Sequence, residues 1–200
     1  MRIGIDIDNV ISNFNQVLLD EYIYHDKKLR NNGIIHKDEY IRKMFDWSRE
    51  EESSFYHENI EQIAKKLDVI AGAKECIDKL KIDGHDIYII TGRDNGEYSD
   101  PYRITNDWLN KNNIFYNKLI FTNAYNKQSK ADVCIKNNID IMIDDSASIC
   151  SNCLNRGITT LLMDTPYNRK SNITRVNNWE EIYEYITNYK KEKINVILDT

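Results

Sequence analysis

Five short runs of β-branched and aliphatic residues recur along the chain, and helix-length amphipathic stretches separate them. The runs occupy residues 2–7 (RIGIDI), 86–91 (DIYIIT), 118–122 (KLIFT), 140–144 (DIMID) and 159–163 (TTLLM). The stretches with helical periodicity are residues 73–83, 101–112, 127–137, 146–156 and 178–190. Strands that alternate with helices are joined by right-handed crossovers. The pattern therefore predicts an α/β fold with a doubly wound parallel sheet, covered by helices on both faces.

Residues 10–72 interrupt this alternation. They show helical periodicity, many charges and several aromatic residues, but no convincing strand. A crossover helix needs far fewer residues, so we expect a helical cap inserted after the first strand and lying over the sheet edge. The predicted organisation is a core domain of residues 1–9 and 73–200, with a helical cap of residues 10–72.

The composition indicates one core rather than several. The chain has 200 residues, of which 41% are hydrophobic, and its net charge of -5 comes from interspersed acidic and basic residues. A nucleic-acid polymer is therefore not expected as a partner. No apolar run approaches the ~20 residues of a membrane span, and the first residues resemble a strand rather than a leader. We expect a cytoplasmic protein with no membrane partner, and the sequence leaves the oligomeric state open.

The four cysteines fall in the predicted helices and have neither the spacing of a disulfide framework nor that of zinc knuckles. Cys150 and Cys153 form a C-x-x-C pair. At this spacing on a helix, we interpret them as two small buried residues rather than as a redox pair. The sequence alone leaves open whether they have any redox role.

Polar residues follow the predicted strands, where ligands bind in open parallel sheets. Asp6 and Asp8 lie two apart at the end of the first strand, so they would face the same side and repel each other unless a cation or a reaction required them. Asp144 and Asp145 lie at the end of a later strand and bring the number of acids at this edge to four. A divalent ion would offset their mutual repulsion, and oxygen ligands suit Mg²⁺. A hydroxyl and a lysine beside that ion would bind a phosphate group. The other candidates at strand or helix ends are Thr91, Gly92, Lys127, Lys130, Asp144 and Asp145.

The order DIDNV, TGR, lysine, IDD resembles the four motifs of the haloacid dehalogenase superfamily of phosphohydrolases, across the whole chain. More narrowly, DIDNVISNF, AGAKECIDKLK and WLNKNNIFYNKLIF resemble the 5'(3')-deoxyribonucleotidases of the type C pyrimidine nucleotidase family. The sequence departs from that family at Asn9, where glycine is usual. Because asparagine tolerates a left-handed backbone, the same turn is expected there.

The resemblance implies a Mg²⁺-dependent phosphomonoesterase that acts on a small phosphate ester, most specifically a nucleoside monophosphate. It makes Asp6 the nucleophile of an aspartyl-phosphate mechanism and Asp8 the acid and then the base. Mg²⁺ would bind the Asp6 carboxylate, the Asp8 carbonyl and Asp145, with Asp144 behind them. Phosphate oxygens would bind Thr91 and the Gly92 amide. Lys130, or alternatively Lys127, would neutralise the negative charge of the nucleophile and of the transferring phosphoryl group.

Several alternatives stay open or are disfavoured. Phe14, Phe45 and Trp47 are candidates to contact the substrate, with Phe14 preferred for stacking on a base, but each could equally belong to the cap's own core. Arg93 could bind phosphate or pair with a nearby acid. A phosphatase for sugar phosphates or other small esters is the second function. A non-catalytic phosphate-binding module is a third, whereas a receiver domain is disfavoured because the acidic pair follows the lysine, and a dehalogenase because Asp8 is present.

Overall fold

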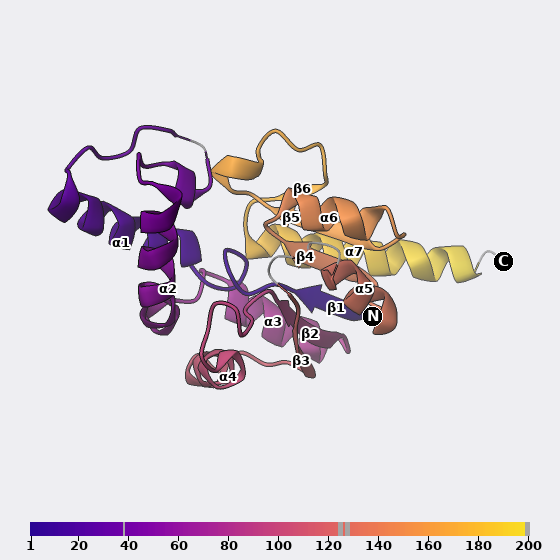
Figure 1. The fold of residues 1–200 in the computed structure, drawn as a ribbon. Helices are drawn as coiled ribbons and strands as arrows, with labels where there is room; N and C mark the ends of the chain where they lie inside the picture. The colour runs from indigo at the N-terminus through magenta and orange to yellow at the C-terminus, as the bar shows by residue number, and fades with distance from the viewer. Residues whose placement is uncertain (38, 124–125, 127–128, 199–200) are drawn as a thin grey trace.

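A computed structural model describes residues 1–37, 39–123, 126 and 129–198, with the side chains of Ser129 and of residues 192–198 left aside. One parallel sheet forms the centre, with strand order β3-β2-β1-β4-β5-β6 (Figure 1). This order is that of a doubly wound α/β fold, as the sequence predicts. The strands are β1 (Arg2–Ile5), β2 (Asp86–Thr91), β3 (Lys118–Phe121), β4 (Ile141–Asp144), β5 (Thr159–Met163) and β6 (Arg175–Val176). β6 has only two residues, too few to give a periodic signal in the sequence.

The five helices predicted after the insertion are all present, with ends within a few residues of the expected ones except at α7, which is longer. They are α3 (Ala73–Ile82), α4 (Pro101–Lys111), α5 (Ser129–Lys136), α6 (Ala147–Leu154) and α7 (Trp179–Leu198). The insertion contributes α1 (Phe14–Leu29), the 3₁₀ helix η1 (Ile41–Lys43) and α2 (Arg49–Lys66), and a second 3₁₀ helix, η2 (Pro166–Asn168), follows β5. None of the helices described is both long and apolar enough to cross a membrane.

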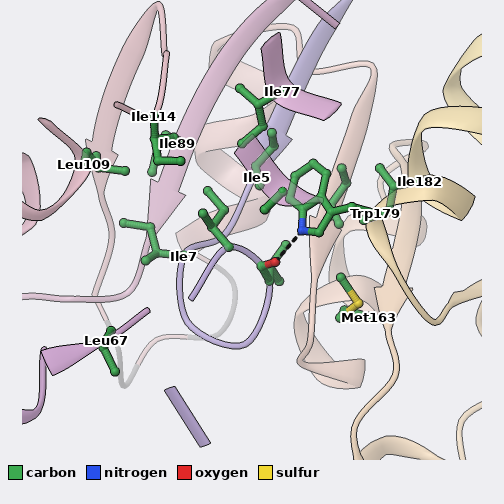
Figure 2. Close-up of a cluster of buried hydrophobic side chains, with 14 of the residues drawn as sticks. Ile5, Ile7, Leu67, Ile77, Ile89, Leu109, Ile114, Met163, Trp179 and Ile182 are labelled. Carbon is green, nitrogen blue, oxygen red and sulfur yellow. Dashed lines mark hydrogen bonds between the residues drawn. The ribbon is translucent and has the colours of Figure 1, made fainter. Parts of the chain in front are cut away.

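Alternate residues of the central strands face opposite sides of the sheet, and both sides are buried. Ile5 pairs with Ile89 and Ile143 in the neighbouring strands, and this face packs against α3 and α7. At its edge, the buried Trp179 donates from Nε1 to the carbonyl of Val10 at 2.7 Å (Figure 2). That bond ties α7 to the loop that follows β1.

The opposite face of the sheet is packed tightly against α5 and α6. A Cβ at Gly4 would lie 2.8 Å from the sulfur of Met142 and 3.1 Å from Cδ1 of Ile90, so a larger residue would require these side chains to shift. Cys134 and Cys153 are fully buried on this side, and Cys150 is buried as well. All have free thiols, which agrees with their interpretation as small buried residues.

The two ends of the insertion leave the core side by side. The backbone amide of Asn13 donates to the carbonyl of Asp68 at 3.1 Å. The backbone amide of Ile70 donates to the carbonyl of Ile11 at 2.8 Å. From this paired base, α1 and α2 project to one side of the sheet (Figure 1). The start of α2 is fixed by a capping box, in which Ser48 and Glu51 exchange hydrogen bonds between side chain and backbone.

The insertion has its own aromatic cluster, formed by Tyr22, Phe45, Trp47 and Phe55. The rings of Tyr22 and Trp47 stack with centroids 4.7 Å apart. The indole of Trp47 also donates to the buried carboxylate of Asp26 at 2.9 Å. Aromatic pairs in such geometries stabilise a small core beyond the area they bury. The cluster therefore supports the insertion internally.

Candidate active site

The backbone after β1 turns sharply and leaves Asp6 and Asp8 at the carboxyl edge of the sheet. The amide of Asp6 still bonds to Ile143 of β4 at 3.0 Å, and the carbonyl of Ile7 then accepts from Ile11 at 2.8 Å. Asn9 adopts a left-handed backbone with φ 63°, as expected for a residue in the usual position of glycine. Because β2 and β4 flank β1 and continue the sheet in opposite directions, this point is the topological switch where ligands bind.

Lys130 lies between two carboxylates in the interior. Its Nζ is 2.9 Å from Asp6 Oδ1 and 2.7 Å from Asp144 Oδ2, and all three residues are buried. The Asp144 carboxylate also accepts from the amide of Ser146 at 2.8 Å. The pKa of Lys130 is raised, because Asp144 and Asp6 outweigh the opposing effect of burial. The lysine is therefore a fixed positive charge beside Asp6.

Asp6, Asp144 and Asp145 form a compact group of acids. One carboxylate oxygen from each lies within 4.8 Å of the other two, and all three side chains are buried. Burial raises the pKa of Asp6 well above its usual range; Lys130 opposes this shift, while Asp144 and Asp145 add to it. Burial and then Asp144 raise the pKa of Asp145 to about 6. Three buried acids with one lysine leave negative charge uncompensated, and their oxygen ligands fit a divalent cation of the Mg²⁺ type.

Asp145 is held by residues from two other segments. The side-chain amide of Asn9 donates to Asp145 Oδ2 at 2.8 Å, and the hydroxyl of Tyr167 in η2 donates to the same oxygen. Asn168, the next residue, donates to the Asp145 carbonyl at 2.8 Å. These three contacts fix both the side chain and the backbone of Asp145.

Arg93 pairs with a nearby acid, which is one of the two roles that the sequence leaves open for it. Its Nε and Nη2 reach the two oxygens of Asp8 at 3.0 and 2.5 Å, and the arginine is only 2% exposed. Burial works against the charge, but Asp8 more than compensates, so the pKa of Arg93 is raised. Ser12 adds a hydroxyl 3.3 Å from the same carboxylate. Asp8 is thus held in one orientation by these two side chains.

A cavity of about 190 Å³ opens beside these residues. Asp6, Asp8 and Lys130 are among the residues that line it. The rest of its lining consists of Gly92, Arg93, Glu97, Thr122, Asn123, Asn126 and Ile149. The predicted residues Asp6, Asp8, Gly92 and Lys130 are therefore brought together around one space.

Of the other predicted phosphate contacts, Thr91 lies within the described residues. Thr91 is fully buried, and its hydroxyl accepts from the backbone amide of Arg93 at 3.3 Å. Its contact with phosphate stays a prediction. Lys127, the alternative to Lys130, lies outside the described residues.

The three aromatic candidates do not line the cavity. Phe45 and Trp47 belong to the aromatic cluster of the insertion. Phe14 is partly buried where α1 begins, and it packs against both the main core and the small cluster that contains Ile60 and Tyr98. Their contact with a substrate stays a prediction, and Phe14 is the closest of the three to Asp8 along the sequence.

Three residues of the site are not expected from the sequence: Glu97, Asn9 and Tyr167. Glu97 lines the cavity and lies 3.4 Å from the hydroxyl of Tyr56 in α2. Burial, with the charges of Asp94 and Asp8, raises the pKa of Glu97 to about 7. A signal for Tyr167 was present, since the polar residues after β5 also lie at the carboxyl edge of the sheet. Glu97 lies in a loop beyond TGR, where no spacing marks it.

Comparisons with known proteins agree with this geometry. Residues 1–192 match the family model described as "5' nucleotidase, deoxy (Pyrimidine), cytosolic type C protein". The chain is 29% identical over 204 residues to a Bacillus subtilis protein called "Putative nucleotidase YqfW", covering 98% of each chain. It is 29% identical over 191 residues to a Clostridium acetobutylicum nucleotidase, covering 92% of each.

The fold is also shared with solved structures. A hydrolase of the haloacid dehalogenase-like family from Streptococcus pneumoniae superposes with a TM-score of 0.66 at 13% identity, covering 92% of this chain and 97% of that one. The family match over nearly the whole chain and the parallel sheet with acids at its carboxyl edge lead to one conclusion. The chain belongs to the cytosolic type C family of 5' deoxyribonucleotidases, and it has the fold of haloacid dehalogenase-like hydrolases.

Proposed function

We propose that this phosphatase hydrolyses nucleoside monophosphates, with Mg²⁺ as its cofactor and Asp6 as its nucleophile. The observation that carries the proposal is the arrangement of Asp6 beside a buried lysine and two further acids, with Asp8 lining the same cavity as Asp6 and the lysine. Mg²⁺ would bind the Asp6 carboxylate, the Asp8 carbonyl and Asp145, and when bound it supplies positive charge for the phosphate oxygens.

The residues of the chain divide the reaction into two displacements. The Asp6 carboxylate attacks phosphorus and forms an aspartyl-phosphate, while Asp8 gives a proton to the departing ester oxygen. Asp8 then takes a proton from the water that hydrolyses the aspartyl-phosphate, which returns both groups to their starting states. Lys130 stabilises the transferring phosphoryl group by its fixed charge, and Gly92 offers a backbone amide at the edge of the cavity.

The size of the cavity bears on the substrate. At about 190 Å³ it is smaller than the ~300–1,000 Å³ of pockets that enclose drug-sized ligands. It suits a phosphate and the first atoms of its leaving group, so the nucleoside would extend toward the insertion, near Phe14 and Tyr56. The polar lining by Glu97, Asn123 and Asn126 favours a second candidate, a phosphatase for sugar phosphates, whose hydroxyl groups would bond to these side chains.

A substrate panel separates these two functions. Deoxyribonucleotides, ribonucleotides and sugar phosphates are compared by kcat/KM at one Mg²⁺ concentration, with phosphate release as the readout. The proposal expects the highest values for nucleoside monophosphates. Preference for a sugar phosphate over every nucleotide would replace the first function by the second, without affecting the mechanism at Asp6.

A further inference from the structure

Two donors meet on one oxygen of Asp145. The Asn9 amide lies 2.8 Å from Oδ2, the Tyr167 hydroxyl donates to the same atom, and the two donors are 3.2 Å from each other. No hydrogen bond from the described residues reaches Oδ1. A carboxylate whose one oxygen is occupied by two donors is left with the other oxygen for a cation. Groups that orient a metal ligand in this way typically change metal affinity by 10–100-fold when removed.

The segment that carries Tyr167 is anchored on Asp145 as well. Asn168 donates from one side-chain nitrogen to the carbonyls of Asp145 and Met163, at 2.8 and 2.7 Å. Arg175 in β6 donates to the Asn168 side chain at its other end. The 3₁₀ helix η2 is therefore fixed to the acidic loop, the segment after β4 that contains Asp145. The Tyr167 hydroxyl has little freedom to leave Asp145.

The ring of Tyr167 makes a second contact, with the insertion. It stacks on Tyr40 with centroids 4.4 Å apart and planes 22° from parallel. Tyr40 immediately precedes η1, so this stack joins the insertion to the residue that bonds Asp145. One side chain thus contacts the insertion through its ring and a metal-ligand candidate through its hydroxyl.

We propose that Tyr167 and Asn9 are positioning residues that present Asp145 to the divalent cation through Oδ1, and that the Tyr40–Tyr167 stack couples the position of the insertion to metal binding. The proposal rests on the metal site of the proposed function. The coupling is reciprocal. A cation that orders Asp145 also favours the stacked position of the insertion, and loss of the stack lowers the affinity for the cation.

The test is Mg²⁺ affinity without substrate, measured by calorimetry on the full chain. Tyr167→Phe keeps the ring and its stack but removes the hydroxyl, and should weaken Mg²⁺ binding about 10–100-fold. Asn9→Gly removes the other donor, is compatible with the positive φ, and should act in the same direction. Tyr183→Phe is the matched control, because it removes a tyrosine bond to Asp83 at 2.8 Å on the surface, and should leave affinity unchanged.

The coupling has its own variants. Tyr40→Ala removes the stack and should weaken Mg²⁺ binding several-fold. Tyr40→Phe keeps the ring and its stack, so Mg²⁺ binding should stay near the wild-type value. Melting temperatures in chelator must stay near wild type, which separates positioning from general loss of structure. Wild-type Mg²⁺ affinity in folded Tyr167→Phe and Asn9→Gly proteins would overturn the positioning role, and wild-type affinity in Tyr40→Ala would overturn the coupling. If the wild-type protein itself binds no divalent cation, the proposed metal site fails instead.

Discussion

Arg93 donates to both carboxylate oxygens of Asp8, at 3.0 and 2.5 Å, from a position that is only 2% exposed. A two-point contact of this kind fixes the plane of the carboxylate as well as its position. For a residue that must pass a proton to a leaving oxygen, orientation matters as much as charge. The pair therefore links a residue of the TGR segment to the proton transfers proposed for Asp8.

Arg93→Gln should impair substrates with poor leaving groups most. Glutamine offers a single amide group, so Asp8 keeps its place less firmly, and alkyl esters should lose ~10-fold or more in phosphorylation rate while an activated aryl phosphate loses little. Asp8→Asn sets the upper limit of that difference, ~10²-fold or more. Rapid-quench measurements on both ester types check this. Arg103→Gln, which removes an exposed pair with Asp100, serves as control. Equal losses on both ester types would exclude a role in proton transfer.

Glu97 should make substrate binding depend on pH. Its pKa is raised to about 7, so above that pH it ionises and adds a negative charge to a cavity that binds an anion. KM should therefore rise with pH through this range in the wild type, and Glu97→Gln should remove the rise. Glu61→Gln changes a carboxylate that bonds to the Ser99 amide outside the cavity lining, and should retain it. An unchanged pH profile of KM in Glu97→Gln would show that Glu97 does not sense the substrate.

Phe14→Ala distinguishes a base-stacking residue from a packing residue. A base stacked on an aromatic ring gains ~1–3 kcal/mol, so KM for a deoxyribonucleotide should rise while kinetics with a small phosphate ester stay nearly constant. Phe45→Ala, in the aromatic cluster of the insertion, should instead lower the melting temperature. Kinetics with both esters and melting temperatures are compared. A normally folded Phe14→Ala protein with unchanged nucleotide KM would remove Phe14 from the substrate site.

The acidic group should make the metal-free protein less stable as pH rises. The folded pKa of Asp145 is about 6 against an ordinary 3.8, and that of Asp6 is raised as well. The folded state therefore holds protons that the unfolded state has released, and the free energy of unfolding decreases as pH rises from about 4 through 6. Mg²⁺ should reverse this loss, so its stabilising effect should grow over the same range. Denaturant unfolding in chelator and in Mg²⁺ measures both. An Mg²⁺ effect that is constant from pH 4 to 7 would contradict the assignment.

The central strands were predictable because β1, β4 and β5 are buried on both faces and so read as short aliphatic runs. The Ile3–Ile5 and Ile141–Ile143 alternations place adjacent strands in register, and the acids directly after them fall at the same edge without further information. The family resemblance rested on those same positions. β6 escaped notice because it has two residues and only one of them is buried.

The partners of the acids were less predictable, because they depend on contacts between distant segments. Asn9 and Tyr167 are 158 positions apart and meet only when η2 folds over the acidic loop. Arg93 was noticed but could not be assigned, since phosphate binding and pairing with an acid require the same residue. Phe45 and Trp47 are hydrophobic, which fits a substrate contact and an internal cluster equally well. Their packing against Tyr22 is visible only in the folded structure, so the sequence could not decide between the two roles.

The central claim is that Asp6 is the nucleophile of a reaction that requires a divalent cation. Its most direct measurement is the turnover of an aryl phosphate, with excess Mg²⁺ and with excess chelator, by wild type and by Asp6→Asn of verified fold. The account predicts hydrolysis by wild type in Mg²⁺ alone, and none above background in the variant or in chelator. Undiminished turnover by folded Asp6→Asn, or by wild type in chelator, would contradict it.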